Sequence, residues 1–380
     1  MARILILGGG FGGLAVARTL RDRRPDSDDE IILVDKQSHF LVGFRKSWVL
    51  VGESTLEEGL RPIADQSTAG VRVIQGEIEA IDPDARAATV DGERIEADVL
   101  VVALGAELYP EKIPGFSEHA HSVYDRAGVE AAREALQSFT GGRVVVGIFG
   151  EVIKCPAAPY EMALLVHEQL STRGVDFELE VFTPKPGSLP VAGPAACDAL
   201  DGRLAAHGIR FGANKQAVRV DAEAVVFADG SRSAYDLLLG IAPHRAPQVV
   251  RNSALTQSAP WLPVDSRTLE TSFDGVYAIG DVARVMMAVG KPMPKAGVFA
   301  EGMGMTVGER IAANLAGESP TAEFNGEGGC YLEVGNGQAM LVTGNFLADP
   351  RPDVHLTEPS VEQLQQKFDF EAEHLREWFA

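Results

Sequence analysis

The feature that most constrains this chain is a glycine motif near its start, Gly8-x-Gly10-x-x-Gly13, set between an apolar run and a helix-period pattern. The run from Arg3 to Leu7 predicts a buried strand, and a second apolar run ends at Asp35, 22 residues beyond Gly13. Glycines at this spacing permit a tight turn and a close approach of backbone to pyrophosphate, while the acid is placed to bind a ribose. The unit therefore predicts a strand–helix–strand dinucleotide site; the alternative is an ordinary glycine-rich turn.

Composition narrows the class of protein. The 380 residues include 34 Lys+Arg and 54 Asp+Glu, a formal net charge of −20, and 46% are hydrophobic. Such a chain is globular, with room for two or three domains. An acidic surface repels phosphate backbones, so nucleic acid is not an expected partner, and attraction to an anionic bilayer is weak. No apolar stretch could cross a membrane about 30 Å thick, and the first strand leaves no room for a secretory signal, so we expect a cytoplasmic location.

The pattern along the chain predicts two similar lobes followed by a smaller C-terminal part. The second lobe is predicted from a buried strand at Arg143 to Phe149 and a helix from about Pro156, after which Tyr235 to Gly240 is expected to return to the first lobe. A hairpin around Asn336-Gly337 and a polar amphipathic helix, Val361 to Phe379, end the chain. We therefore expect an α/β fold with two Rossmann-like, doubly wound, three-layer domains, residues 1–110 with 244–315 and residues 111–243, and a small C-terminal α+β domain, residues 316–380.

Two further stretches indicate which dinucleotide binds. Thr271 to Asp281, which reads TSFDGVYAIGD, resembles the far end of the FAD lobe in the pyridine nucleotide-disulfide oxidoreductase superfamily, and Leu100 to Gly105 resembles its middle strand. In that superfamily the aspartate after the glycine binds the ribityl chain, so the resemblance implies FAD; Asp281 alone would suggest a helix cap. The expected cofactor-binding residues are Gly8, Gly10, Phe11, Gly12, Gly13, Asp35, Lys36, Ala103, Gly105, Gly280, Asp281 and Lys295.

The second lobe lacks the glycine fingerprint that an NAD(P)H site requires. After its first strand only Gly147 and Gly150 precede the string Cys-Pro-x-x-Pro-Tyr-Glu, residues 155–161. This string, with Gly329-Cys330-Tyr331, resembles the sulfide:quinone oxidoreductases and, more closely, the flavoprotein subunit of flavocytochrome c sulfide dehydrogenase. The resemblance implies a redox-active disulfide between Cys155 and Cys330 beside the flavin, with sulfide as the electron donor and a quinone or a haem protein as the acceptor.

The residues around Cys155 support a chemical role independently. Because it precedes Pro156, a favoured first helical residue, its sulfur is expected at a helix N-terminus, where the dipole and Lys154 lower the thiol pKa. Glu161, one turn into that helix, is a candidate proton relay; the alternative is a solvated glutamate. Lys295 opens a long helix, and the resemblance implies that it faces the flavin pyrimidine; the alternative is an ordinary capped helix. Cys197 lies on a helical pattern and is expected to be structural.

Other features limit the partners. No CxxC pair has zinc spacing, so no metal is expected. The last helix has a thin apolar stripe among acids, which predicts packing on the protein and at most a weak peripheral contact with the inner membrane face. Of the two electron acceptors we favour a quinone over a haem protein by a small margin. The sequence does not decide whether the chain forms a homodimer. The stretch from Phe40 to Gly52 resembles the sulfide-oxidising family, but Arg45-Lys46 stands near where many members have Asn-Pro.

Two other functions stay open at this point. A type II NADH dehydrogenase would share the architecture, although the missing second fingerprint argues against it. A non-catalytic FAD-binding redox sensor, whose cysteines only switch conformation, belongs to a different class.

Overall fold

The computed structural model describes residues 1–379, and its first sheet carries the glycine motif. The strands are parallel, in the order β21-β9-β1-β2-β5, with bounds β1 Arg3–Leu7, β2 Glu30–Asp35, β5 Arg72–Gln75, β9 Val99–Val102 and β21 Val276–Ala278. The side chains of β1 from Ile4 to Leu7 are 0% exposed, because both faces of the sheet are covered. A parallel strand that is buried on both faces has a continuous run of apolar residues, and it is this run that predicts the strand from the sequence.

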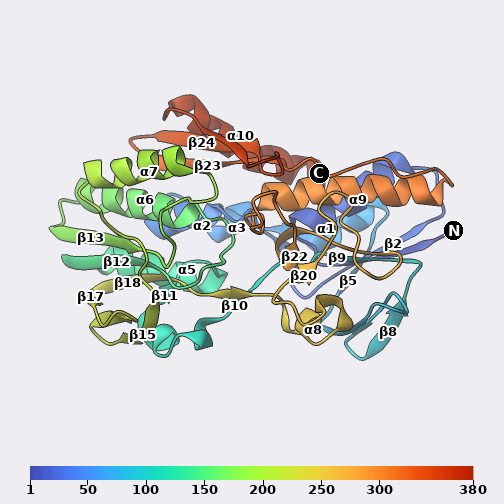
Figure 1. Ribbon diagram of the computed structural model, residues 1–380, viewed down its shortest axis with the longest axis horizontal. Helices are drawn as coiled ribbons and strands as arrows, with labels where there is room; N and C mark the ends of the chain where they lie inside the picture. The colour runs from blue at the N-terminus through green and yellow to red at the C-terminus, as the bar shows by residue number, and fades with distance from the viewer. Residues whose placement is uncertain (380) are drawn as a thin grey trace.

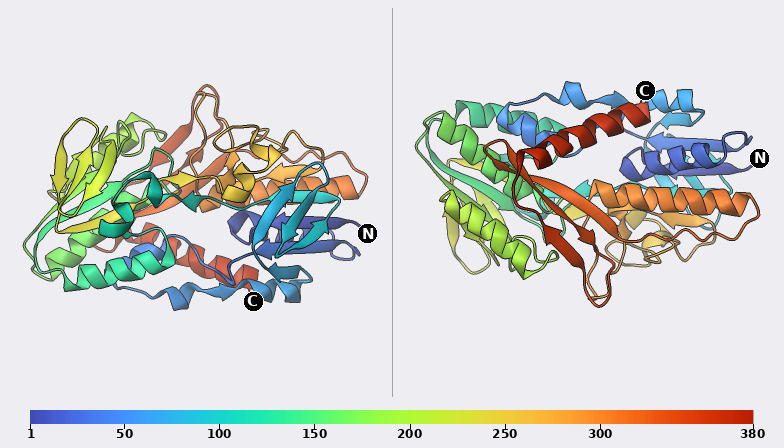
Figure 2. Two further views of the ribbon diagram at one scale, coloured as in Figure 1. Left: turned by 90° about the horizontal axis from the view of Figure 1, so that it is seen from below. Right: turned by 90° about the horizontal axis from the view of Figure 1, so that it is seen from above.

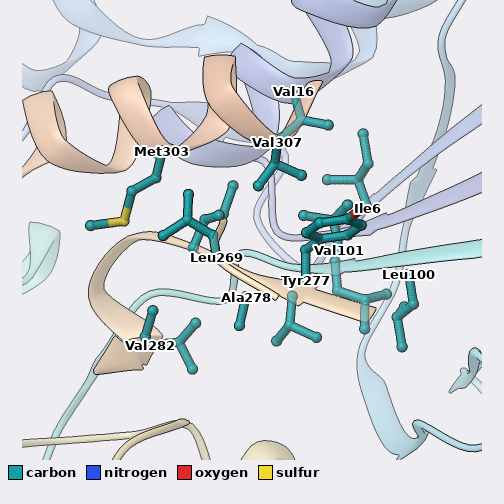
Figure 3. Close-up of a cluster of buried hydrophobic side chains, with 14 of the residues drawn as sticks. Ile6, Val16, Leu100, Val101, Leu269, Tyr277, Ala278, Val282, Met303 and Val307 are labelled. Atoms are coloured by element: carbon teal, nitrogen blue, oxygen red, sulfur yellow. The ribbon is translucent and has the colours of Figure 1, made fainter. Parts of the chain in front are cut away.

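Helices α1 (Phe11–Arg23) and α9 (Gly297–Leu315) lie side by side on this sheet (Figure 1). A Cβ at Gly304 would lie 2.4 Å from the Gly12 carbonyl oxygen, and one at Gly308 would lie 2.6 Å from Cβ of Thr19. The two helices therefore run parallel at close range, and their N-termini lie at the same end of the sheet. Figure 3 shows Val16 and Val307 of these helices packed over Tyr277 and neighbouring strand residues in one apolar core.

The second sheet is also parallel. Its order is β11-β18-β12-β13-β14, with bounds β11 His121–Ser122, β12 Gly142–Ile148, β13 Phe177–Phe182, β14 Arg210–Gly212 and β18 Leu237–Ile241. Helices α5 (Arg126–Ser138), α6 (Ala158–Thr172) and α7 (Pro194–Ala206) accompany it. The α/β fold with two Rossmann-like sheets is thus confirmed. The expectation that residues 235–240 return to the first sheet is wrong: β18 pairs with β12 and β11, because an all-apolar run does not specify which sheet buries it.

The C-terminal part lies along one side of the molecule, across the junction of the two sheets (Figures 1 and 2). Antiparallel strands β23 (Glu327–Gly335), β24 (Gln338–Asn345) and β25 (Asp353–Leu356) precede helix α10 (Val361–Phe379). The expected hairpin at Asn336-Gly337 is present, and both residues have left-handed φ angles, 55° and 66°. No helix within residues 1–379 combines the length and apolar character needed to span a bilayer.

The remaining elements are short. Two three-stranded antiparallel sheets flank the parallel ones, and two-stranded pairs such as β10–β19 connect the lobes. Their bounds are β3 His39–Phe40, β4 Arg61–Pro62, β6 Ile78–Asp82, β7 Ala87–Val90, β8 Glu93–Glu96, β10 Glu107–Leu108, β15 Ala217–Asp221, β16 Ala224–Phe227, β17 Arg232–Ala234, β19 His244–Arg245, β20 Leu262–Pro263, β22 Ala283–Arg284, α2 Arg45–Val51, α3 Leu56–Gly59, α4 Phe116–His119 and α8 Gln248–Arg251.

Candidate active site

The glycine motif forms a cradle at the C-terminal end of β1. Gly8 has φ +112° and an added Cβ would lie 2.3 Å from the Ala103 carbonyl oxygen, while a Cβ at Gly13 would lie 1.8 Å from the Gly8 carbonyl oxygen. These two glycines are therefore required by the fold itself. A Cβ at Gly10 would meet nothing within 4 Å, so this backbone, at the N-cap of α1, faces open space. An open backbone at a helix N-terminus fits a pyrophosphate.

Asp35 ends β2 beside this cradle. Its carboxylate accepts hydrogen bonds from the backbone N–H of Gly9 at 2.6 Å and of Gln37 at 2.7 Å. The acid is thus held at the glycine turn, where the FAD hypothesis needs a ribose-binding group. Lys36 points elsewhere, because its amine lies 3.6 Å from the Glu77 carboxylate and its side chain is 57% exposed.

The side chain of Phe11, which the sequence predicted to bind the cofactor, packs against other aromatic side chains instead. Its ring packs against Phe40 (centroids 5.3 Å apart) and against Trp378 and His374 of α10. The side chain therefore joins the C-terminal helix to the glycine turn. Only its backbone, at the first position of α1, is available to a phosphate.

The second half of the predicted cofactor site lies at the start of α9. Gly280 and Asp281 form a short 3-10 turn after β21, and burial raises the pKa of the Asp281 carboxyl above its usual range. The Lys295 amine donates to the carbonyl oxygens of Asp281 and, at 3.3 Å, Ala283. It also lies 3.7 Å from the Trp261 ring centroid. Lys295 thus holds the Asp281 turn in place, whereas the sequence predicted an amine directed at the flavin pyrimidine.

Cys155 and Cys330 are brought together although they are 175 positions apart in the chain. Both are free thiols, and a hydrogen bond joins their side chains. Cys155 has a left-handed φ of +46°, and its N–H donates to the Lys295 carbonyl oxygen at 2.7 Å, which attaches it to the start of α9. Cys330 lies on β23. Helix α6 begins at Ala158, three residues after Cys155 and two after the predicted start.

The two thiols have opposite pKa shifts. The hydrogen bond from Cys330 lowers the pKa of the Cys155 thiol, and the Ala158 N–H at the start of α6 acts in the same direction against burial and the charge of Glu161. The same hydrogen bond, together with burial, raises the pKa of Cys330 well above its usual range. Cys155 is therefore the more readily deprotonated of the two thiols, and Cys330 is the one that donates to it.

A buried charge cluster lies behind the cysteines. The Lys367 amine of α10 is 2.9 Å from Oε2 of Glu161 and 3.6 Å from Oε1 of Glu333, which lies three residues after Cys330. Glu161 is 2% exposed and Lys367 is 0% exposed, so the alternative of a solvated glutamate is wrong. Glu161 also accepts the Glu333 backbone N–H at 3.0 Å, which ties α6 to β23. The indole N–H of Trp48 donates a hydrogen bond to Oε1 of Glu333 at 2.8 Å, which adds Trp48 to the cluster.

Sequence reasoning missed Lys367 and Glu333. Burial raises the pKa of Glu333 to about 7, despite the opposing charge of Lys367. The only available signal was a lysine on the apolar side of an amphipathic helix, and a charged residue there is usually interpreted as solvated.

An apolar cavity of about 400 Å³ has Cys330 in its wall. It lies between the loop after β13, the segment before α9 and strands β23 and β24. Six prolines stiffen its wall: Pro156, Pro184, Pro186, Pro190, Pro292 and Pro294. Lys185, Lys291 and Lys295 also line it, together with one acid, Glu151, so cations outnumber anions in its wall although the whole chain is acidic. The cavity lining includes Cys330 and not Cys155.

Gly147 and Gly150, the two glycines at the end of β12 and just after it, pack closely against other parts of the protein. A Cβ at Gly147 would lie 2.7 Å from the rings of Phe149 and Phe182, which are themselves buried. A Cβ at Gly150 would lie 2.8 Å from the Cα of Pro243. These two glycines therefore leave room for neighbouring side chains and backbone.

Arg45 and Lys46, which stand near where many sulfide-oxidising proteins of this kind have Asn-Pro, lie in the first turn of α2. Arg45 is 9% exposed, and its Nε donates to Glu371 of α10 at 2.7 Å while a second nitrogen pairs with the same carboxylate. It also bonds to Ser54 and Glu58 around α3. Arg45 therefore clamps the C-terminal helix to the first lobe, a role that Asn could not fill.

Comparison with known proteins agrees with this fold. The chain is 26% identical over 365 residues to the mitochondrial sulfide:quinone oxidoreductase of Mus musculus, covering 91% of this chain and 79% of that protein. It is 25% identical to the sulfide-quinone reductase of Aquifex aeolicus, covering 91% and 83%. The solved structure of the sulfide:quinone oxidoreductase from Aquifex aeolicus superposes with a TM-score of 0.90 at 22% identity, covering 100% of this chain and 92% of that one.

A family model covers most of the chain as well. The model described as pyridine nucleotide-disulphide oxidoreductase matches residues 2–297, which include both halves of the predicted FAD site and Cys155. Together with the two Rossmann-like sheets, this match shows that the chain belongs to the pyridine nucleotide-disulphide oxidoreductase family.

Proposed function

We propose that this protein is an FAD-dependent sulfide dehydrogenase that passes electrons to a quinone, that is, a sulfide:quinone oxidoreductase. The observation that carries the proposal is the contact between the Cys155 and Cys330 thiols at the wall of an apolar, lysine-lined cavity. The names of its curated relatives support the same donor and acceptor.

FAD, when bound, would accept the two electrons that the cysteine pair takes from sulfide. The residues that would hold it are the open backbone around Gly10, the Asp35 carboxylate and the Asp281 turn. We propose that residues 1–110 with 244–315 form the FAD-binding unit, that residues 111–243 form a second Rossmann-like unit without a nucleotide, and that residues 316–380 bring Cys330 to the site.

The cavity and the pKa shifts together assign different roles to the two cysteines. In the oxidised pair, hydrosulfide enters through the cavity and attacks Cys330, which lines it. The bond between Cys330 and Cys155 breaks, a new sulfur–sulfur bond forms on Cys330, and Cys155 leaves as a thiolate, so atoms and charge balance. The lower pKa of Cys155 makes it the better leaving group.

The Glu161–Lys367 pair holds this geometry and sets the local charge. Glu161 joins the Cys155 helix to the Cys330 strand through the Glu333 N–H, and the charges of Glu161 and Lys367 oppose each other at both sulfurs. Glu333, with a pKa of about 7, can hold or release one proton near neutral pH.

The acceptor and location complete the proposal. We propose a quinone as the electron acceptor. A haem protein is the alternative, which the acceptor assay described below would reveal. Val361 and Phe368, 65% and 41% exposed on α10, offer at most a weak peripheral contact to a bilayer at the inner membrane face. We propose a cytoplasmic location for the chain and leave a homodimer open.

Anaerobic mixing tests the donor. Sulfide should bleach the flavin absorbance of the FAD-loaded protein and NADH should not; bleaching by NADH alone would favour a type II NADH dehydrogenase. Cys155→Ser and Cys330→Ser should each abolish sulfide turnover, whereas Cys197→Ser should not. Variants that oxidise sulfide as fast as the parent protein would refute the disulfide mechanism. If neither parent nor variants turned over, the redox-sensor function would be favoured.

A second assay tests the acceptor. Sulfide-dependent reduction of a soluble quinone analogue is compared with reduction of cytochrome c by the same preparation. Quinone reduction should be faster, and preferential reduction of cytochrome c would replace quinone with a haem acceptor.

A further inference from the structure

His374 of α10 lies between two groups that can only accept hydrogen bonds. Its Nδ1 is 2.7 Å from the Phe370 carbonyl oxygen, and its Nε2 is 2.9 Å and 3.1 Å from the two carboxylate oxygens of Glu301 on α9. A neutral imidazole carries one N–H and can satisfy only one of these partners. The arrangement is therefore complete only when His374 is an imidazolium.

Two carboxylates face this ring. Glu301 approaches it from α9 and Glu377 from its own helix, whereas the α1 side presents the ring of Phe11, which does not titrate. Burial disfavours the charged form, but the hydrogen bond and the charge of Glu301 outweigh burial and raise the pKa of His374 above its usual range. The imidazolium therefore persists above the pH at which an exposed histidine loses its proton.

His374 belongs to a cluster of aromatic rings around Phe11, the first residue of α1. Four rings surround Phe11, and three of them come from α10: His374, Phe370 and Trp378, with centroids 5.9, 6.3 and 5.3 Å away. On another side, a Cβ at Gly297, the first residue of α9, would lie 3.0 Å from the Phe11 ring. The Phe11 side chain thus holds the starts of α1 and α9 against each other and against the C-terminal helix.

These two helix starts belong to the backbone that would hold FAD. The N-cap of α1 is Gly10, in the glycine cradle, and α9 follows the Asp281 turn that Lys295 holds. Phe11 and His374 need not touch the cofactor, since they act on the position of backbone N–H groups that would bind its phosphates. A contact that keeps both helix starts in place favours the conformation that binds the cofactor.

We propose that His374 is a positioning residue for the cofactor site: as an imidazolium it fastens the C-terminal helix to the starts of α1 and α9, and FAD is bound more weakly once this proton is lost. The inference rests on the FAD site of the proposed function. The His374 side chain is 15% exposed, so loss of the proton leaves either the Phe370 carbonyl or the Glu301 carboxylate without a donor in a place that water reaches poorly. The ring cluster then packs less firmly on Phe11, and FAD affinity falls as pH rises.

The test measures the affinity of the apoprotein for FAD by fluorescence titration at pH 6 and pH 9, without sulfide or quinone. His374→Gln replaces the ring by a neutral amide. His355→Gln is the matched control, because His355 also pairs with a carboxylate, that of Asp353, but its side chain is 69% exposed. At pH 6 the FAD dissociation constant of His374→Gln should be about tenfold above that of the parent, and by pH 9 the two should agree. His355→Gln should match the parent at both pH values.

Glu301→Gln supplies a second comparison. It keeps an acceptor for His374 but removes the charge that raises the pKa of the imidazole, so the fall in FAD affinity should begin at a lower pH than in the parent. In spectra of apoprotein labelled with carbon-13 histidine, the imidazole signal that His374→Gln lacks should titrate at a lower pH in Glu301→Gln as well.

The ratio of the variant and parent dissociation constants decides the outcome, because other groups also titrate between pH 6 and pH 9. A ratio for His374→Gln that is the same at both pH values, or that stays within about twofold at pH 6, would overturn the inference. If His374→Gln does not fold, an unchanged pH midpoint in Glu301→Gln would overturn it. Because sulfide is absent, each result is separate from whether the protein oxidises sulfide.

Discussion

The Lys367 amine lies 2.9 Å from Oε2 of Glu161, and neither side chain is more than 2% exposed. This ion pair joins the last helix of the chain to the helix that follows Cys155. Its neighbour Glu333 extends the connection to the Cys330 strand. The C-terminal helix is thereby attached to both cysteine-bearing segments through one amine.

Lys367 is the first of three charged residues on one face of α10. Glu371 and His374 follow at i+4 and i+7, and they pair with Arg45 of α2 and Glu301 of α9. The helix is therefore fastened to three different elements by ion pairs at helical spacing.

Lys367→Met should destabilise the protein by about 3 to 5 kcal/mol, because it leaves two buried carboxylates without their cation. Arg376→Met, on the exposed face of the same helix, is the control and should cost little. Urea unfolding measures both. The double variant Lys367→Met with Glu161→Gln should recover part of the loss; equal stability of the two single variants would show that the buried pair contributes nothing.

Glu333 should make the protein less stable as pH rises from about 4.5 to about 7. Its folded-state pKa is raised to about 7, so the folded protein holds a proton that the unfolded chain has already released in this window. Glu333→Gln should remove a pH-dependent loss of up to about 3 kcal/mol. Unfolding curves at several pH values compare it with Glu327→Gln, an exposed change on the same strand. A profile of Glu333→Gln parallel to that of the parent would contradict the assignment.

Cys330→Ala should raise the pKa of Cys155, whereas Cys330→Ser should raise it less. The hydrogen bond from Cys330 is the largest cause of the lowered Cys155 pKa, and a serine hydroxyl can still donate to a thiolate. The pH dependence of thiolate ultraviolet absorbance, measured in a Cys197→Ala background, reports the Cys155 titration alone. Identical titrations in the alanine and serine variants would exclude the hydrogen bond as the cause.

Two alanine substitutions in the glycine motif should have separable effects. A Cβ at Gly10 meets nothing within 4 Å, so Gly10→Ala should fold with nearly the stability of the parent but bind FAD more weakly, because the methyl group occupies the space left for the pyrophosphate. A Cβ at Gly13 would lie 1.8 Å from the Gly8 carbonyl oxygen, so Gly13→Ala should unfold more easily even without FAD. Thermal unfolding of the apoprotein and FAD titration by fluorescence distinguish the two; undiminished FAD affinity of Gly10→Ala would count against the cradle.

The sequence by itself determined the features that depend on local pattern. The strand–turn–helix around Gly8 and Gly13, the hairpin at Asn336-Gly337 and the C-terminal helix were all predictable, because backbone geometry and hydrophobic period are encoded by neighbouring residues. The identity of the two cysteines also came from the sequence, although through resemblance rather than through spacing.

Only the tertiary structure decided which distant groups meet. The pairing of β18 with β12 could not be predicted, since an apolar run buried on both faces fits either sheet. On α10 the sequence predicted Phe368 in the packed apolar stripe and made no prediction for Lys367. In the structure Phe368 is 41% exposed and Lys367 is 0% exposed. The reason is electrostatic: a buried lysine is tolerated only where other segments supply carboxylates, and those carboxylates are more than thirty residues away along the chain.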